Sequence, residues 1–154
     1  MSKSHMPRRH TKPAPARARR LLPLLACIAL AIGLVVAGAC WRDHARQADT
    51  LAAFQKLQGR WQRADGGYIV EIRSVEPGGK MVAAYFNPRP INVATAEASM
   101  IGGTLRVFIE LRDVNYPGSN YQLTYDAADD RLKGSYFQAA LRESYDVYFD
   151  RLKP

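Results

Sequence analysis

Cysteine and histidine are absent from this chain after residue 44. Its two cysteines, Cys27 and Cys40, and its three histidines all lie within the first 44 residues. The rest of the chain therefore cannot form a disulfide and must be held together by a hydrophobic core. It also lacks the thiol nucleophile, the usual zinc ligands and the imidazole base on which many enzymes depend. The composition argues against an enzyme and predicts neither a metal nor a cofactor.

Acidic residues are missing from the N-terminal part. Residues 1–40 contain seven of the 22 Lys and Arg residues and no Asp or Glu. The remaining residues contain 15 basic and 14 acidic side chains, a net charge of only +1. The overall charge of +8 therefore belongs to a tail, and it does not indicate that the rest of the chain binds nucleic acid.

One long uncharged run, LLPLLACIALAIGLVVAGA, covers residues 21–39. A helix of that length rises about 28 Å, close to the ~30 Å of a bilayer core. Residues 1–20 form a basic flank typical of a cytoplasmic segment or a signal n-region, so the C-terminal part is expected to be exported. Residues 21–40 are accordingly predicted to be a hydrophobic signal or anchor segment.

Three processing outcomes fit this segment. Its length exceeds the roughly 7 to 15 apolar residues of a typical cleaved signal, which favours a retained anchor. The stretch LVVAGAC resembles a bacterial lipobox, in which Cys40 would become the lipidated first residue, although Ala37 replaces the usual leucine. The same small residues would also suit ordinary signal peptidase cleavage. All three outcomes place the C-terminal domain outside the cytoplasm, on the periplasmic or extracytoplasmic side of a bacterial cell envelope. Residues 21–40 or a lipidated Cys40 would tether it to the membrane.

Residues 41–58 form the next segment. They bring small and apolar residues to one helical face, with polar residues opposite. We therefore expect a short amphipathic linker helix that caps one end of the following domain. The residues of its apolar face are Ala48, Leu51, Ala52, Phe54 and Leu57.

After residue 58, helical spacing gives way to an alternation of apolar and polar residues. In the clearest segment, residues 105–111, every second residue is aliphatic. Turn signals recur seven times and so separate eight strands, and closing eight strands into a barrel removes exposed sheet edges. The fold class expected for residues 59–154 is an all-β, eight-stranded antiparallel up-and-down barrel. The turn signals lie at residues 64–67, 76–80, 87–91, 101–104, 115–120, 126–130 and 141–144.

The start and the end of this region carry a family resemblance. A Gly59-Arg60-Trp61 segment opens the first strand, and Arg151 lies near the end of the last strand. This pattern resembles the calycin superfamily, which includes lipocalins and avidins, whose barrels start with Gly-x-Trp. The resemblance implies that Trp61 plugs the end of the barrel near the helix. It also implies that Arg151 packs over the Trp61 indole.

Two groups of residues are candidates for binding. All eight tyrosines follow residue 59, and four of them share strand faces with aliphatic residues and are expected to point inward, where they could contact a small, partly polar ligand: Tyr68, Tyr121, Tyr125 and Tyr145.

Alternate turns of a meander lie at the same end of a barrel, and the turns away from the linker helix are the longer ones. This rim is a candidate surface for a ligand or a partner: Asn87, Arg89, Asn92, Asn115, Tyr116 and Asn120.

These patterns predict a membrane-tethered, exported binding module. Its ligand would be a small molecule held in the barrel or at its rim. The alternative is a protein–protein module of the cell envelope, such as an assembly factor or an inhibitor of an exported enzyme, that uses the rim loops.

Overall fold

A computed structural model describes residues 41–153 of the chain. The predictions for residues 1–20, for residues 21–40 and for Cys40 lie outside the described residues. The chain divides into two units, Met1–Asp43 and His44–Pro154, and the second contains the sheet. Among residues 41–153, no helix is long and apolar enough to cross a membrane.

The linker helix covers residues 41–55 and is followed by a turn at residues 56–57. Only the end of its predicted apolar face is buried, because Phe54 and Leu57 pack into the core while Ala48 and Ala52 remain exposed. The helix therefore contacts the sheet through its last turn.

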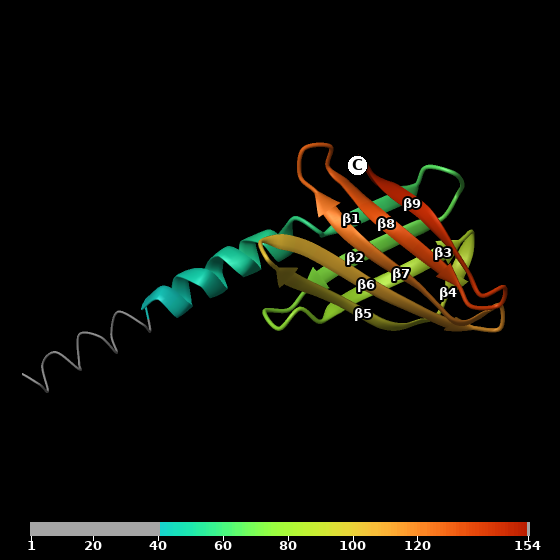
Figure 1. The fold of residues 1–154 in the computed structure, drawn as a ribbon, viewed down its shortest axis with the longest axis horizontal. Helices are drawn as coiled ribbons and strands as arrows, with labels where there is room; N and C mark the ends of the chain where they lie inside the picture. Colours follow the sequence, from blue (N-terminus) through green and yellow to red (C-terminus); the bar gives the residue numbers. More distant parts are fainter. Residues whose placement is uncertain (1–40, 154) are drawn as a thin grey trace, which may run out of the picture. The chain divides into compact units, whose positions relative to one another are not determined.

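The described sheet is a single antiparallel structure of nine strands, which curls into a nearly closed barrel (Figure 1). Its strand order is β4-β3-β2-β1-β9-β8-β7-β6-β5. Adjacent strands in the sheet are consecutive in sequence except where β1 meets β9, and the consecutive strands β4 and β5 lie at the two ends of this order. This confirms the predicted all-β antiparallel barrel. The strands are β1 (Gly59–Arg63), β2 (Ile69–Val75), β3 (Met81–Asn87), β4 (Arg89–Ile91), β5 (Val93–Ile101), β6 (Thr104–Asp113), β7 (Tyr116–Asp126), β8 (Arg131–Gln138) and β9 (Glu143–Leu152).

The prediction of eight strands was wrong by one, because the turn expected at residues 87–91 contains a short additional strand, β4. This strand pairs with β3, whereas β5, which follows after Asn92, pairs with β6. The Asn92 side chain donates to the Arg112 carbonyl at 3.0 Å, and its backbone N–H donates to Asp113 Oδ2 at 3.0 Å. Asn92 thus lies at the break between β4 and β5 and binds the end of β6, while the residue itself is exposed.

The break leaves a seam between β3 and β5. These strands meet only at one end, where Lys80 bridges Glu97 and the Ala98 N–H donates to the Gly79 carbonyl at 2.7 Å. Gly79 is required there, because its φ is 89° and a Cβ would lie 2.1 Å from the Ala98 carbonyl oxygen. A groove of about 730 Å³ follows the rest of the seam.

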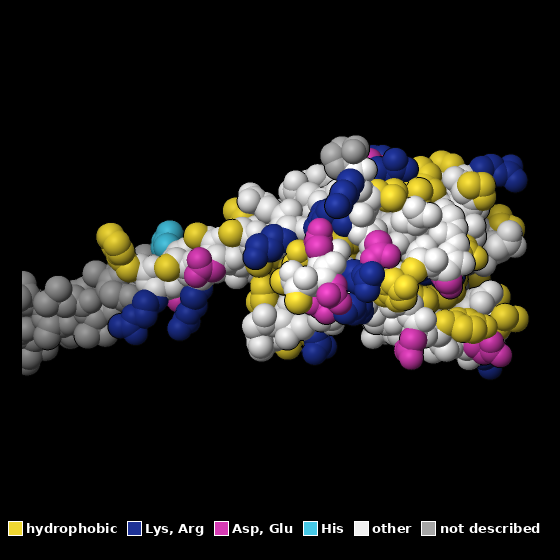
Figure 2. All heavy atoms as spheres, turned by 90° about the horizontal axis from the view of Figure 1, so that it is seen from above, with side chains coloured by type: hydrophobic (Ala, Val, Ile, Leu, Met, Phe, Trp, Pro, Cys, Tyr) yellow, Lys and Arg dark blue, Asp and Glu magenta, His cyan; other side chains and the backbone are white. Residues whose placement is uncertain are grey.

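Alternation along the strands decides which side chains form the core. Leu105, Val107, Ile109 and Leu111 are all buried, as their spacing predicts, while Arg106 lies outside. Charged side chains of both signs are scattered over the surface visible in Figure 2. The largest fully buried side chains are Trp61, Tyr85, Tyr121 and Phe149.

The predicted turn at residues 115–120 was only partly right. The chain turns at Val114 and Asn115, and β7 already begins at Tyr116. The register between β6 and β7 shifts between Leu111 and Arg112, opposite Pro117. A proline is tolerated in a strand at such an irregularity, which explains why a turn-forming sequence belongs to the strand.

Candidate ligand site at the barrel mouth

The end of the barrel beside the linker helix is filled. The Trp61 indole donates from Nε1 to the Leu57 carbonyl at 2.8 Å, and the Arg151 guanidinium lies 4.0 Å from the ring centroid of Trp61. Arg151 also donates to the carbonyls of Gln58 and Lys56, both at 2.6 Å. The structure thus places Trp61 and Arg151 in direct contact at this end, where they tie β1 and β9 to the residues that follow the helix.

Tyr125 belongs to the same end. Its ring packs edge-on against Trp61 with 6.1 Å between centroids, and its hydroxyl donates to Asp130 at 3.0 Å. Asp130 accepts a further hydrogen bond from Arg151 Nε at 2.7 Å, and this bond is the main reason why the pKa of Asp130 is lowered. The structure therefore does not bring Tyr125 together with the other candidate tyrosines.

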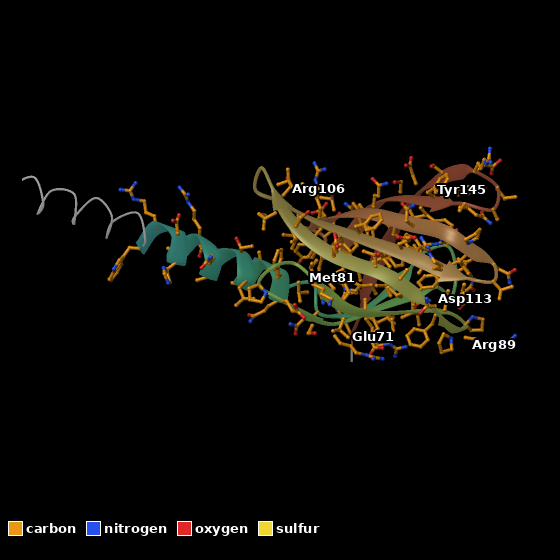
Figure 3. The ribbon with its side chains drawn as sticks, turned by 90° about the horizontal axis from the view of Figure 1, so that it is seen from below. Glu71, Met81, Arg89, Arg106, Asp113 and Tyr145 are labelled. Carbon is orange, nitrogen blue, oxygen red and sulfur yellow. The ribbon has the colours of Figure 1, made fainter. Side chains whose placement is uncertain are left out.

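The opposite end opens into a pocket of about 440 Å³. Figure 3 shows Tyr145, Arg89 and Asp113 at this end of the barrel. Most of the lining consists of polar or aromatic side chains from β1, β3, β7, β8 and β9 and from the turns between them. The lining residues are Arg63, Asp65, Tyr68, Tyr85, Asn87, Asn115, Tyr116, Tyr136, Gln138, Tyr145 and Asp146. We call this cavity the mouth pocket.

Arg63 is the central residue of the mouth pocket. It follows Trp61 by two positions on β1, so its side chain points to the same interior face, and only 9% of it is exposed. Its Nη1 donates to the Tyr121 hydroxyl at 3.1 Å, and its Nε donates to Asp65 at 2.5 Å. Burial opposes the charge of Arg63, but the hydrogen bond to Asp65 and the nearby Tyr121 outweigh it, and the pKa of Arg63 is raised.

Aromatic rings cover the Arg63 guanidinium. Its central carbon lies 3.8 Å from the ring centroid of Tyr68 and 5.5 Å from that of Tyr136. Cation–π contacts of this kind gain strength where water is excluded. The guanidinium is therefore held in a fixed orientation as well as buried.

Beneath Arg63, buried phenols form a hydrogen-bonded pair. The hydroxyls of Tyr85 and Tyr121 lie 3.0 Å apart, and the Tyr121 ring stacks on Tyr136 with 4.6 Å between centroids. Burial raises the pKa of Tyr121 to about 12 and raises the pKa of Tyr85 as well. Both phenols are hence neutral near pH 7, and Arg63 keeps its full positive charge beside them.

The rest of the pocket supplies polar groups. Asn87 donates from Nδ2 to the Tyr116 hydroxyl at 2.6 Å across the mouth. Asp65 and Asp146 are the carboxylates of the lining. Within residues 41–153, no three His, Cys, Asp or Glu side chains gather as metal ligands would. The chemistry that this set offers is hydrogen bonding and charge recognition around one cation.

The structure brings together about half of the residues that the sequence nominated. Tyr68, Asn87, Asn115 and Tyr116 line the mouth pocket, and Tyr121 lies below it. Tyr145 shares the inward face of β9 and lines the pocket from the rim, where 41% of the residue is exposed.

Two other rim candidates do not line the pocket. Arg89 is exposed at the start of β4, and Asn120 lies in β7, where it bonds to the Gly118 carbonyl. Since Tyr121 points inward, its neighbour Asn120 must lie on the opposite face.

Arg63, Tyr85 and Tyr136 were missed as site residues by the sequence reasoning. The signal for Arg63 was present, because a strand that buries Trp61 must also turn residue 63 inward. A charged residue at an inward position is rare unless it is paired, and this marks it for attention. Tyr85 and Tyr136 follow from the same rule once their strands are aligned with the core.

No protein-family model matches the chain, and comparison with curated proteins and with solved structures finds no significant similarity. The calycin resemblance of Gly59-Arg60-Trp61 therefore stays a prediction.

Proposed function

We propose that the barrel is a binding module that holds a small organic anion in its mouth pocket. The observation that carries this proposal is the buried Arg63 guanidinium at the base of the pocket. Taking a guanidinium out of water is costly unless it is paired, so a protein keeps one at a cavity where its charge is used. Among residues 41–153, Asp65 is the one carboxylate bonded to it.

The guanidinium has capacity for a ligand. An arginine carries five N–H donors in a fixed plane, and contacts within the described residues use two positions, Nε to Asp65 and Nη1 to Tyr121. The amides of Asn87 and Asn115 and the hydroxyls of Tyr116 and Tyr145 surround the remaining space. A cavity of about 440 Å³ is within the range of small-molecule sites.

The proposal includes a location in the cell. The basic residues 1–20 and the apolar residues 21–40 support export of the barrel and a membrane tether, through the segment itself or through a lipidated Cys40. A calycin-like module of this kind would hold or collect its ligand on the outer side of the cytoplasmic membrane, in the cell envelope.

Native mass spectrometry tests this function. The full chain, purified from the cells that produce it, is weighed intact and again after denaturation. We expect an extra small mass that is lost on denaturation and is detected as a negative ion. A chain that carries no such mass and gains none from the acidic small-molecule fraction of those cells would contradict the proposal.

A second candidate is a protein partner at the same end. Val114, in the turn between β6 and β7, is 93% exposed, and Leu141, in the turn between β8 and β9, is 59% exposed. These two side chains are exposed apolar groups of the kind that a protein partner at this end would cover. If the pocket is empty, crosslinking from Arg89 and Tyr116 to envelope proteins would test this alternative.

A further inference from the structure

Asp65 occupies the position that a ligand anion would need. It lies in the turn after β1, its carboxylate accepts from Arg63 Nε at 2.5 Å, and its side chain is 62% exposed although that of Arg63 is only 10% exposed. A carboxylate that reaches a buried cation from an exposed turn can leave it when another anion takes its place on the cation. Asp65 thus places a carboxylate on the guanidinium where an anionic ligand would bind, and it is an example of an anion that the guanidinium accepts.

The surroundings of Arg63 restrict how an anion can approach. Tyr68 covers one part of the guanidinium at 3.8 Å and Tyr136 lies at 5.5 Å, so the N–H edges in the guanidinium plane are the open route. A planar carboxylate pairs with such an edge through both of its oxygens. A tetrahedral phosphate or sulfonate also places oxygen atoms out of that plane, toward the rings.

Two further features limit the body of the ligand. The barrel below the pocket is filled by fully buried side chains such as Tyr121 and Phe149, which leaves no channel for a long alkyl chain. The pocket itself is bordered by the rings of Tyr68, Tyr116, Tyr136 and Tyr145, which favour a flat aromatic group over a flexible chain.

We propose that the mouth pocket takes a small aromatic carboxylate, whose carboxylate replaces Asp65 on Arg63. This inference rests on the proposed function and narrows it to one class of ligand. Asp65 acts as a specificity-determining competitor: it lowers the affinity for all anions and is displaced best by a group of its own geometry.

Three probes of different shape test the ligand class on the ¹⁵N-labelled full chain: 4-hydroxyphenylacetate, phenyl phosphate and octanoate. The readout is the NMR signal of the Arg63 Nε–H, which reports on the atom that Asp65 contacts. Arg63→Lys identifies the signal and keeps the charge. We expect 4-hydroxyphenylacetate to shift this signal at concentrations about tenfold lower than the other two, because only it fits both the guanidinium edge and the rings.

A matched pair of variants tests the displacement. Asp65→Asn removes the competitor, while Asp146→Asn removes the same charge from the same pocket at a residue that makes no hydrogen bond or ion pair with Arg63 in the described contacts. We expect Asp65→Asn to bind 4-hydroxyphenylacetate about fivefold more tightly than the wild type does. In this variant no carboxylate at residue 65 competes with the ligand for the Arg63 guanidinium. Asp146→Asn should stay within about twofold of the wild type.

The outcomes separate the two proposals. Tighter binding of phenyl phosphate or octanoate at Arg63 would overturn the aromatic carboxylate and leave the anion-binding function standing. Equal gains in Asp65→Asn and Asp146→Asn would overturn the displacement, because simple charge removal would then explain both. If none of the three probes moves the Arg63 signal at millimolar concentration, the inference fails, and an empty chain in native mass spectrometry would then remove the proposed function as well.

Discussion

Arg63 and Tyr121 are 58 residues apart in the sequence, yet the Arg63 guanidinium donates a 3.1 Å hydrogen bond to the Tyr121 hydroxyl inside the barrel. The first residue comes from β1 and the second from β7, which do not pair with each other in the sheet. The contact can form only when the sheet has curved into the barrel. The proposed site is therefore a product of the completed barrel and not of any one hairpin.

The buried tyrosine pair makes a prediction for alkaline pH. Tyr121 has a pKa of about 12 in the folded protein and that of Tyr85 is also raised, against about 10 in an unfolded chain. Between these values the folded state binds more protons than the unfolded state, so the free energy of unfolding falls as the pH rises above 10. Ultraviolet titration at pH 11 should show at least two of the eight tyrosines still protonated, and all eight ionised in urea. Full ionisation of the folded chain at pH 11 would refute the burial of this pair.

Arg151 is predicted to contribute more to stability than another paired arginine nearby. Arg151→Met removes the bonds to Asp130 and to two carbonyls and the contact with Trp61, and should lower the free energy of unfolding by about 2 kcal/mol. Arg131→Met is the control, because Arg131 pairs with Asp150 at the surface, which is worth about 1 kcal/mol or less. Urea unfolding of both variants measures the difference. An equal loss of unfolding free energy in the two variants would show that Arg151 contributes no more than an arginine in a surface ion pair.

The lowered pKa of Asp130 makes a prediction for acid pH. Hydrogen bonds from Arg151 and Tyr125 stabilise its charged form in the folded state. Its contribution is therefore fully present above the unfolded pKa of about 4 and is lost as the pH falls through the lower folded pKa. Asp130→Asn should be less stable than the wild type at pH 7 by about 1 kcal/mol, since the carboxylate is half exposed, and the gap should close toward pH 2. A gap that is constant between pH 7 and pH 2 would mean that the charge plays no part.

The sequence predicts the class of the fold because alternation is a local signal. The spacing of Leu105, Val107 and Ile109 reports burial directly, and the seven turn signals locate most of the hairpins. The break at Asn92 was not predictable in this way. It depends on bonds from Asn92 to Arg112 and Asp113, which lie on another strand and become neighbours only in the folded chain.

The sequence predicted the end of the barrel at which the candidate site lies, but it did not predict the central residue of that site, Arg63. Asn87 and Tyr116, at the ends of β3 and β7, follow from the rule that alternate turns share an end. Arg63 was overlooked because the alternation along β1 turns its side chain inward with Trp61 but does not show which groups would pair with a charge there. The decisive facts, its burial between Tyr68 and Tyr136 and its bond to Tyr121, join four different strands or turns. No short stretch of sequence contains them.

The seam between β3 and β5 makes a prediction for hydrogen exchange. Residues 81–84 of β3 and 93–96 of β5 lack a partner strand on the seam side, because the bridge is at Lys80 and Glu97 and β4 covers β3 only from Tyr85 onward. Alternate amides in both segments should exchange about a hundredfold faster than that of Ile109 in the paired β6. Uniform protection along β5 would show that the barrel is closed in solution.

The central claim is that Arg63 holds the ligand, and one comparison tests it most directly. The unfolding temperature of the wild type and of Arg63→Gln is measured with and without the acidic small-molecule fraction of the cells that produce the protein. A bound ligand stabilises only the folded state that binds it. We therefore expect the fraction to raise the unfolding temperature of the wild type clearly and that of Arg63→Gln not at all, with Arg63→Lys between them. An equal rise in the wild type and in Arg63→Gln would contradict the account, because the ligand would then bind without the guanidinium.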